Sequence, residues 1–281
     1  MIIRGNVAGR LAAITFALVF GVGSTTRAQS VASQPLTGTL VVAVPAMNGL
    51  VVCSDKRLFN AEAGTYTDNN VKIRKVDNNT LFVATNTIGF YDQKARKMAF
   101  DAFAVTSGYA AQNNFSPETK FWEGLKKEIS GQLRSYFAAR PYAEWPASDR
   151  RNANLLFNLI FYTVRDHRAW SHSIKVYYEK ARTPVIQMSG PITEEVKTTK
   201  LSGKGREVMT YLARNPAAST DPAIQKFDES RFDAETTSEN EAVEFAKKLI
   251  RLTSTGVPKA NVSSASDCAM LDHTAGFRWK T

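Results

Sequence analysis

Histidine and cysteine carry the most versatile chemistry at neutral pH, and this chain has three of the first and two of the second. His167 and His172 flank Trp170 in a segment that reads as a turn between strands, and His273 stands in another turn. A zinc site needs three or four Cys, His or carboxylate ligands at short, fixed spacings. No Cys or Glu is grouped around these histidines at such spacings, so we predict no metal centre and no cofactor.

The two cysteines, Cys53 and Cys268, each lie in an apolar run typical of a strand. In an oxidising compartment they could form a disulfide, and a buried free thiol fits such runs equally well. Both alternatives stay open. The run Gly203-Lys204-Gly205 is too short for a phosphate-binding loop, and no G-x-S-x-G nucleophile turn is present.

Residues 1–28 have the pattern of an export signal. Arg4 and Arg10 precede an uninterrupted apolar stretch over residues 11–22, and Thr26 and Ala28 are small residues at the positions that a signal peptidase reads. The apolar stretch is far shorter than the ~20 residues that a membrane-spanning helix needs. We therefore predict an exported protein, periplasmic or secreted, with no stable membrane insertion; an uncleaved anchor is the alternative.

The composition is that of an ordinary globular protein. The chain has 281 residues, of which 43% are hydrophobic and 22% charged, so neither a disordered chain nor a cysteine-rich scaffold is indicated. Removing residues 1–28 takes away three of the 36 basic residues and none of the 26 acidic ones, which leaves a net charge of +7. The basic residues lie in short scattered pairs without interleaved aromatic residues, so we predict no nucleic-acid partner.

Strand-forming runs open and close the chain. Each predicted strand is an apolar or alternating run bounded by turn residues. The first runs fall in residues 39–53, which form a hairpin around 45–49, and in 71–76 and 81–84, which flank the turn 77–79. Later runs occupy 154–164, 171–179, 185–188, 267–271 and 277–279.

Two helices are well signalled, and a third is shorter. Ser116 and Pro117 start the first helix, whose apolar residues recur at three- and four-residue steps to Phe137. Ser238 and Glu241 form a capping box before the second, which ends ahead of Gly256. The short helix follows Gly205 and uses Val208, Met209 and Leu212. Strands, helices, strands, helix and strands in this order predict an α+β fold with helices stacked on antiparallel sheets.

Both ends of the chain resemble a known family. The string GTLVVAVPAMNGLVVCSDKR at 38–57, followed by KIRKV at 72–76, resembles the start of 20S proteasome β-type subunits and of their bacterial threonine-protease relatives. The helix 239–250 and the runs DCAML at 267–271 and GFRW at 276–279 look like that family's last helix and final strands. The likeness spans most of residues 38–279, and the segments 89–114 and 141–148 depart from it.

The resemblance implies the N-terminal-nucleophile hydrolase fold, a four-layer αββα sandwich of two antiparallel sheets flanked by helices. It places one such domain at residues 39–281. In that family a Gly-Thr bond is cut autocatalytically, and Gly38-Thr39 stands where this bond would be. Cleavage by signal peptidase after Ala28 would then leave residues 29–38 as a short propeptide.

The resemblance also assigns the chemistry. Thr39 would supply the hydroxyl nucleophile, and its freed α-amine, with an ordinary pKa of about 7.7 to 8.0, would accept the hydroxyl proton. Lys72 would act as the neighbouring ammonium group that lowers the proton affinity of both, and Asp55 would hold that lysine in place. Asp55 stands sixteen residues after Thr39, which is the family's own separation. Without the resemblance these three are ordinary strand residues.

Three parts of the family's site differ in this chain. Thr85 stands where the family has a glycine whose backbone N–H stabilises the oxyanion. Lys204 replaces the supporting serine between two glycines, and only Ser263 or Ser264 could provide the hydroxyl that normally precedes the closing strand. These differences leave open whether the supporting residues are rebuilt or the site is silent.

We therefore expect an exported threonine-type peptidase or amidohydrolase that acts on a peptide or protein substrate. A catalytically silent proteasome-like subunit, serving as an assembly or binding module, is the alternative, and an amidase for a small amide is a third. Since the family usually assembles into rings, a homo-oligomeric ring is also implied.

Overall fold

The structure is a computed structural model that describes residues 34–37, 39–60, 65–92, 95–145, 155–215, 217, 224, 236–257 and 261–280. All of them belong to one compact unit, residues 31–281. The predicted signal peptide, Gly38 and the predicted propeptide other than residues 34–37 lie outside the described residues.

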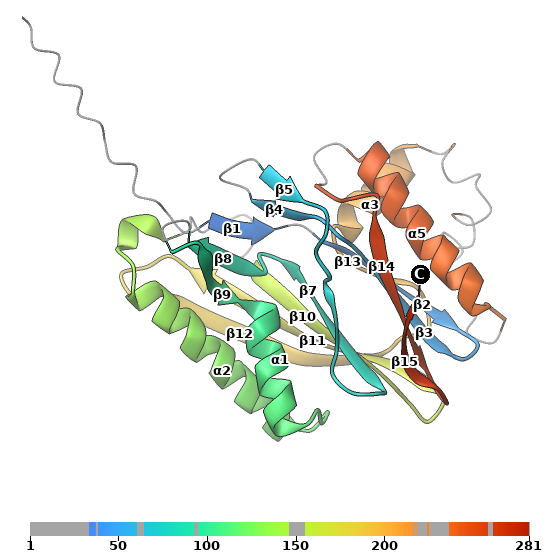
Figure 1. Ribbon diagram of the computed structural model, residues 1–281, viewed down its shortest axis with the longest axis horizontal. Helices are drawn as coiled ribbons and strands as arrows, with labels where there is room; N and C mark the ends of the chain where they lie inside the picture. Colours follow the sequence, from blue (N-terminus) through green and yellow to red (C-terminus); the bar gives the residue numbers. More distant parts are fainter. Residues whose placement is uncertain are drawn as a thin grey trace, which may run out of the picture. The chain divides into compact units, whose positions relative to one another are not determined.

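Two large antiparallel sheets, here called sheets I and II, contain most of the predicted strands (Figure 1). Sheet I has the order β13-β2-β3-β14-β15 and consists of β13 (Lys200–Gly203), β2 (Leu40–Ala46), β3 (Gly49–Asp55), β14 (Ser266–Asp272) and β15 (Gly276–Lys280). Sheet II has the order β12-β11-β10-β7-β6 and consists of β12 (Val185–Glu195), β11 (Arg168–Glu179), β10 (Leu155–Arg165), β7 (Thr80–Asn86) and β6 (Ile73–Lys75).

A third antiparallel sheet, sheet III, adds to the two that we expected. Its order is β5-β4-β1-β8-β9, with β5 (Thr65–Thr67), β4 (Leu58–Asn60), β1 (Gln34–Thr37), β8 (Gly89–Asp92) and β9 (Lys97–Asp101). β8 and β9 come from the segment that departs from the resembled family. β1 is the described part of the predicted propeptide, and it is the central strand of this sheet.

The described helices are α1 (Ala102–Asn113), α2 (Thr119–Ala138), α3 (Gly205–Arg214) and α5 (Glu239–Gly256), together with a short 3-10 helix at Tyr142–Glu144. The apolar stripe of α2 is buried, as its spacing predicts. Its N-cap, however, is Glu118 rather than Ser116, because the Ser116 hydroxyl instead accepts the Glu118 N–H in a local turn. The capping box of α5 is confirmed, since Ser238 and Glu241 bond each other's backbone N–H.

Three apolar clusters hold these elements together. One joins α1 and α2 to sheet II, and another joins α3 and α5 to sheet I (Figure 1). The third consists of inward-facing residues of both sheets, such as Val41 and Val52 from sheet I and Val83 and Ile160 from sheet II. Side chains alternate along each strand, so one face of each sheet packs against helices and the other face packs against the opposite sheet. The structure confirms the mixed α+β class with antiparallel sheets.

Two local predictions were wrong. The predicted turn around Trp170 contains only Asp166 and His167, so Trp170 lies within β11. His172 lies within the predicted strand 171–179 and is buried there. Hydrogen bonds to Thr163 and Thr193 satisfy its ring nitrogens and allow that burial. Met209 is 46% exposed, because its position on α3 is one step around the helix from Val208, which is buried.

The structure settles the cysteine alternative in favour of a disulfide. Cys53 on β3 and Cys268 on β14 are directly paired in the sheet I ladder, and their sulfur atoms are bonded. Both residues are fully buried. Across the described helices, we find no segment long and apolar enough to cross a membrane.

Candidate active site

The hairpin formed by β2 and β3 brings the start of one strand against the end of the other. Its register pairs Val41 with Ser54, so Asp55 reaches the peptide group between Thr39 and Leu40. The Leu40 N–H donates to Asp55 Oδ1 at 2.7 Å, and Lys72 Nζ lies 3.1 Å from both carboxylate oxygens. Thus the carboxylate links Lys72 to the backbone immediately after Thr39.

Asp55 accepts more hydrogen bonds than the resemblance implied. Besides Leu40 and Lys72, the backbone N–H of Arg57 donates to Oδ2 at 3.0 Å and that of Ser263 at 3.4 Å. These donors come from two strand ends and from the loop before β14. A carboxylate held from so many directions has a fixed orientation, and it therefore fixes the position of the Lys72 ammonium group.

Burial governs the electrostatics of this group. The exposed fraction is 1% for Thr39, 0% for Asp55 and 1% for Lys72. Removal from water lowers the pKa of Lys72 below its ordinary value, and the attraction of Asp55 opposes that shift. Lys72 therefore holds its proton less tightly than a surface lysine does, and it is joined through Asp55 to the backbone next to Thr39.

Gly203 and Lys204 position the carbonyl group of Thr39. The Lys204 N–H donates to Thr39 O at 3.0 Å, and Gly203 pairs with Leu40 in the ladder between β13 and β2. Gly203 has φ +70°, and a Cβ there would overlap the Thr39 carbonyl oxygen. Only glycine therefore permits this close approach of the two backbones.

The side chain of Lys204 points to a different partner. Its ammonium group lies 3.0 Å from Glu207 Oε1 in the first turn of α3. The contact between Lys204 and Thr39 is consequently made by the backbone, and any side chain at this position could make it.

Thr85 lies at the same end of the two sheets. A Cβ on Gly203 would lie 3.3 Å from the Cβ of Thr85, which places this side chain beside the backbone that contacts Thr39. Thr85 is buried, and its hydroxyl has no hydrogen-bond partner among the described residues. The Oδ1 atom of Asn158, the residue paired with Thr85 on β10, also lacks a partner there. Sequence reasoning did not identify Asn158.

The structure distinguishes the two candidate serines. Ser263 is buried, donates its backbone N–H to Asp55, and accepts the Ala265 N–H with its hydroxyl at 3.1 Å. Ser264 is exposed. Ser263 therefore belongs to the group around Asp55, whereas no contact assigns Ser264 to it.

Arg57 and Asp68 also adjoin the site, and sequence reasoning missed both. The Arg57 guanidinium binds the Asp68 carboxylate through two hydrogen bonds of 2.7 Å and lies 4.0 Å from the centroid of the Tyr66 ring. Hydrogen bonding to Arg57, with a smaller contribution from the Ser263 hydroxyl, lowers the pKa of Asp68. The position of Arg57 two residues after Asp55 was a usable signal, because its backbone N–H reaches the Asp55 carboxylate. No local pattern identifies Asp68.

No three His, Cys, Asp or Glu side chains of the described residues are grouped to hold a metal ion. One surface cavity lies between α3 and the end of α5, and another lies beside the turn 77–79. Neither of these is lined by Thr39, Asp55 or Lys72.

Comparison with known proteins gives likenesses to solved structures only. No family model matches the chain, and no curated protein matches its sequence. Among solved structures, the Gly-1 mutant of Anbu from Hyphomicrobium sp. strain MC1 is similar over 86% of each chain, with 16% identity and a TM-score of 0.44. A likeness at this level assigns neither an activity nor the role of any residue.

Proposed function

We propose that this chain is an exported threonine peptidase of the N-terminal-nucleophile type, activated by cleavage of the Gly38-Thr39 bond. The observation that carries the proposal is the buried carboxylate of Asp55, which contacts both Lys72 Nζ and the amide immediately after Thr39. Asp55 thus joins Lys72 to the peptide group between Thr39 and Leu40.

Cleavage is needed to complete the chemistry. Adding one water molecule across the Gly38-Thr39 peptide bond leaves a carboxylate on Gly38 and an amine on Thr39. With its ordinary pKa of about 7.7 to 8.0, that amine is partly neutral at pH 7 and can take the proton of the Thr39 hydroxyl. Lys72 favours the neutral amine and the developing alkoxide through its positive charge.

The position of β1 favours a peptide substrate over a small amide. β1 is antiparallel to both β4 and β8: Thr37 pairs with Phe59, and Leu36 pairs with Asn60 on one side and Gly89 on the other. An extended peptide in this position gains backbone hydrogen bonds on both edges. Its next peptide group would then lie at Thr39.

The disulfide supports the proposed export. Disulfides persist in oxidising compartments and are rare in the reducing cytosol. The bond between Cys53 and Cys268 is therefore consistent with the predicted signal peptide at residues 1–28 and with a periplasmic or secreted location. The four-layer N-terminal-nucleophile sandwich and a homo-oligomeric ring remain part of this proposal.

One observation favours the silent-subunit alternative. The Thr85 side chain occupies the position at which the resembled family has a glycine, and it adjoins Gly203 beside the Thr39 carbonyl. Losing one oxyanion donor typically costs ~10²-fold or more in rate. A chain that keeps the fold while the Thr85 side chain blocks the substrate carbonyl from that backbone N–H could serve as an assembly or binding module.

The mass and N-terminal sequence of the mature protein test the proposal. Expression of the full chain in an exporting host should give an N-terminus at Thr39, while the Thr39→Ala variant should keep the N-terminus that signal peptidase produces. An electrophile that traps N-terminal threonines should label the mature wild type and not the variant.

Each other outcome either overturns the proposal or supports one of the alternative functions. A wild-type N-terminus at Gln29 would overturn the proposal, because the amine is then never freed. Correct processing without labelling or turnover would support the silent subunit. Turnover of small amides but not of peptides would support the amidase, and the native mass in solution decides whether a ring forms.

A further inference from the structure

The cavity beside the turn 77–79 lies at the opposite end of β7 from Thr85 and belongs to none of the chemistry above. Its volume of about 430 Å³ lies within the ~300–1,000 Å³ range of small-molecule sites. It is lined by the turn residues Asp77, Asn78 and Asn79, by Thr80, by Phe115 and Pro117 from the α1–α2 connection, and by Thr163, Val164 and Arg165 from the end of β10.

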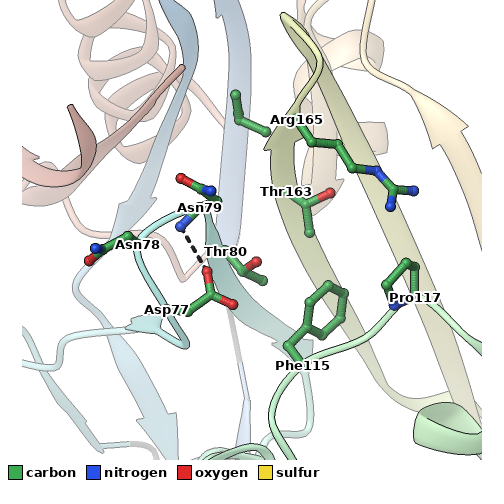
Figure 2. Close-up of a pocket in the computed structure, with 9 residues that line it drawn as sticks. Asp77, Asn78, Asn79, Thr80, Phe115, Pro117, Thr163 and Arg165 are labelled. Carbon is green, nitrogen blue, oxygen red and sulfur yellow. Dashed lines mark hydrogen bonds between the residues drawn. The ribbon is translucent and has the colours of Figure 1, made fainter. Parts of the chain in front are cut away.

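Opposite charges stand on the two sides of this cavity. Figure 2 shows Asp77 on one side and Arg165 on the other, with Thr80 and Thr163 between them. One oxygen of the Asp77 carboxylate, Oδ1, accepts the Asn79 N–H at 2.7 Å, which fixes the side chain and leaves Oδ2 for another donor. Within the described part of the chain, neither Asp77 nor Arg165 forms an ion pair.

The floor of the cavity is polar and buried. Thr80 and Thr163 are direct neighbours across the ladder between β7 and β10, and both are buried. Thr163 Oγ1 lies 3.3 Å from His172 Nε2, and His172 Nδ1 lies 3.0 Å from Thr193 Oγ1. The imidazole therefore holds the Thr163 hydroxyl in one orientation before any ligand arrives.

The walls are also fixed in advance. The Phe115 ring stacks on Phe161 with centroids 5.3 Å apart and meets the edge of Trp122, so it presents a rigid apolar face. Arg165 ends β10 and pairs with Arg168 across the two-residue turn Asp166-His167, which fixes its backbone. The charge of Arg165 also contributes, after burial, to the lowered pKa of His172, so the guanidinium acts on the floor of the cavity.

We propose that this cavity binds a short peptide with free termini, whose ammonium group contacts Asp77 and whose carboxylate contacts Arg165. A single amino acid carries both charges on one carbon, whereas in Figure 2 the Thr80 and Thr163 side chains lie between Asp77 and Arg165. A peptide of two or three residues fits this order better, because its charged termini are separated by backbone groups that match the hydroxyl groups of Thr80 and Thr163 and the amides on the rim. Phe115 would contact a small apolar side chain.

This inference does not depend on the proposed function. The cavity is far along β7 from the candidate active site, and neither Thr39 nor Lys72 contributes to it. A peptidase releases peptides with free termini, but the charges and lining of this cavity favour such a ligand whether or not this chain cleaves peptides.

Calorimetric titration with three matched peptides tests the proposal. The full chain carries Thr39→Ala so that no peptide is consumed, and the probes are trialanine, N-acetyl-trialanine and trialanine amide. Trialanine should bind saturably, and blocking either terminus should weaken binding at least about tenfold, the loss expected for one charge-assisted hydrogen bond.

Two substitutions then test which residue binds which terminus of the peptide. Asp77→Asn keeps the acceptor for the Asn79 N–H; it should weaken trialanine about tenfold and leave N-acetyl-trialanine unchanged. Arg165→Gln should weaken trialanine by a similar factor and leave trialanine amide unchanged. Each variant is titrated with both the free and the blocked peptide. An unfolded variant would lose binding of both peptides, so it cannot give a loss that is confined to trialanine. Glu179→Gln and Arg182→Gln each remove one charge from an exposed residue away from the cavity. They serve as matched controls and should not change the affinity for any of the three peptides.

The proposal is wrong if trialanine gives no saturable heat at millimolar concentration. It is equally wrong if the blocked peptides bind as well as trialanine, or if Asp77→Asn and Arg165→Gln have no more effect than the two controls.

Discussion

The carboxylate of Asp55 and the ammonium group of Lys72 lie 3.1 Å apart with both side chains fully buried. Most ion pairs of the described residues are partly exposed, where solvent weakens them. In this pair each charge depends on the other, because neither can be solvated by water. The pair therefore controls folding as well as the chemistry proposed for Thr39.

Replacing Lys72 should cost more stability than replacing both partners. Lys72→Met leaves a buried carboxylate without its counter-ion and should lower the free energy of unfolding by about 3–5 kcal/mol. Adding Asp55→Asn removes the charge and keeps an acceptor for the Leu40 N–H, so the double variant should regain part of the loss. Urea unfolding measures both. Equal losses in the two variants would contradict a buried, mutually dependent pair.

Gly203→Ala should disturb the site through the backbone. The substitution combines a positive φ with overlap against the Thr39 carbonyl oxygen, and strain of this kind costs about 1–3 kcal/mol. A matched control is Gly131→Ala on α2, where a Cβ meets no other atom and helix propensity favours alanine by roughly 0.5–1 kcal/mol. Thermal unfolding should show a lower Tm for Gly203→Ala and a higher Tm for Gly131→Ala than for the wild type. An unchanged Tm in Gly203→Ala would contradict the close approach of β13 to Thr39.

The hydroxyl of Thr85 can be tested by Thr85→Val, which keeps the side-chain shape. If the hydroxyl is unpartnered, its removal should leave stability unchanged or raise it by up to about 1 kcal/mol. If the hydroxyl instead donates to the oxyanion, the same variant should lower kcat by ~10²-fold or more with KM little changed. Thr85→Ser retains the hydroxyl and should retain the rate, while a stability loss well above 1 kcal/mol in the valine variant would reveal a partner.

His172 should make stability rise with pH. Burial, with a smaller effect of Arg165, lowers the pKa of His172 to about 4 from its ordinary 6.5. Between these two values the unfolded chain binds the proton and the folded chain does not, so the free energy of unfolding increases as the pH is raised from about 4 to about 6.5. The shift corresponds to a gain on the order of 3 kcal/mol.

Unfolding of the wild type and of His172→Gln at several pH values measures this contribution. The variant should lose the part of the slope that His172 causes, whereas His167→Gln, a change in an exposed turn, should keep it. An unchanged slope in His172→Gln would mean that the imidazole stays accessible to protons in the folded protein.

Sequence patterns predicted the parts of this fold that local chemistry determines. The hairpin of β2 and β3, the capping box of α5 and the apolar stripe of α2 each follow from spacing alone. The burial of His172 was not predicted, because it depends on hydrogen bonds to Thr163 and Thr193 on the two strands that flank β11. Sheet III was missed because its central strand pairs with segments that are distant in sequence.

In the candidate site, too, sequence patterns could indicate some residues, whereas others are recognisable only through long-range contacts. The resemblance selected Thr39, Asp55 and Lys72, and the structure brings them to one place; their catalytic roles stay a prediction. Arg57 and Asp68 could not be selected in this way, since Asp68 comes from an exposed segment that reaches the site through Arg57 and Ser263. Asn158 is recognisable only through its ladder pairing with Thr85.

The disulfide has a consequence for how the protein responds to reducing agents. Cys53 and Cys268 sit on neighbouring central strands of sheet I, beneath the residues of α5, and neither has exposed surface. An attacking thiolate must approach a sulfur atom directly, so the folded molecule should resist dithiothreitol until α5 separates from the sheet. The rate of reduction would then report how often that helix opens, and each opened molecule would lose the only covalent cross-link between segments 215 residues apart.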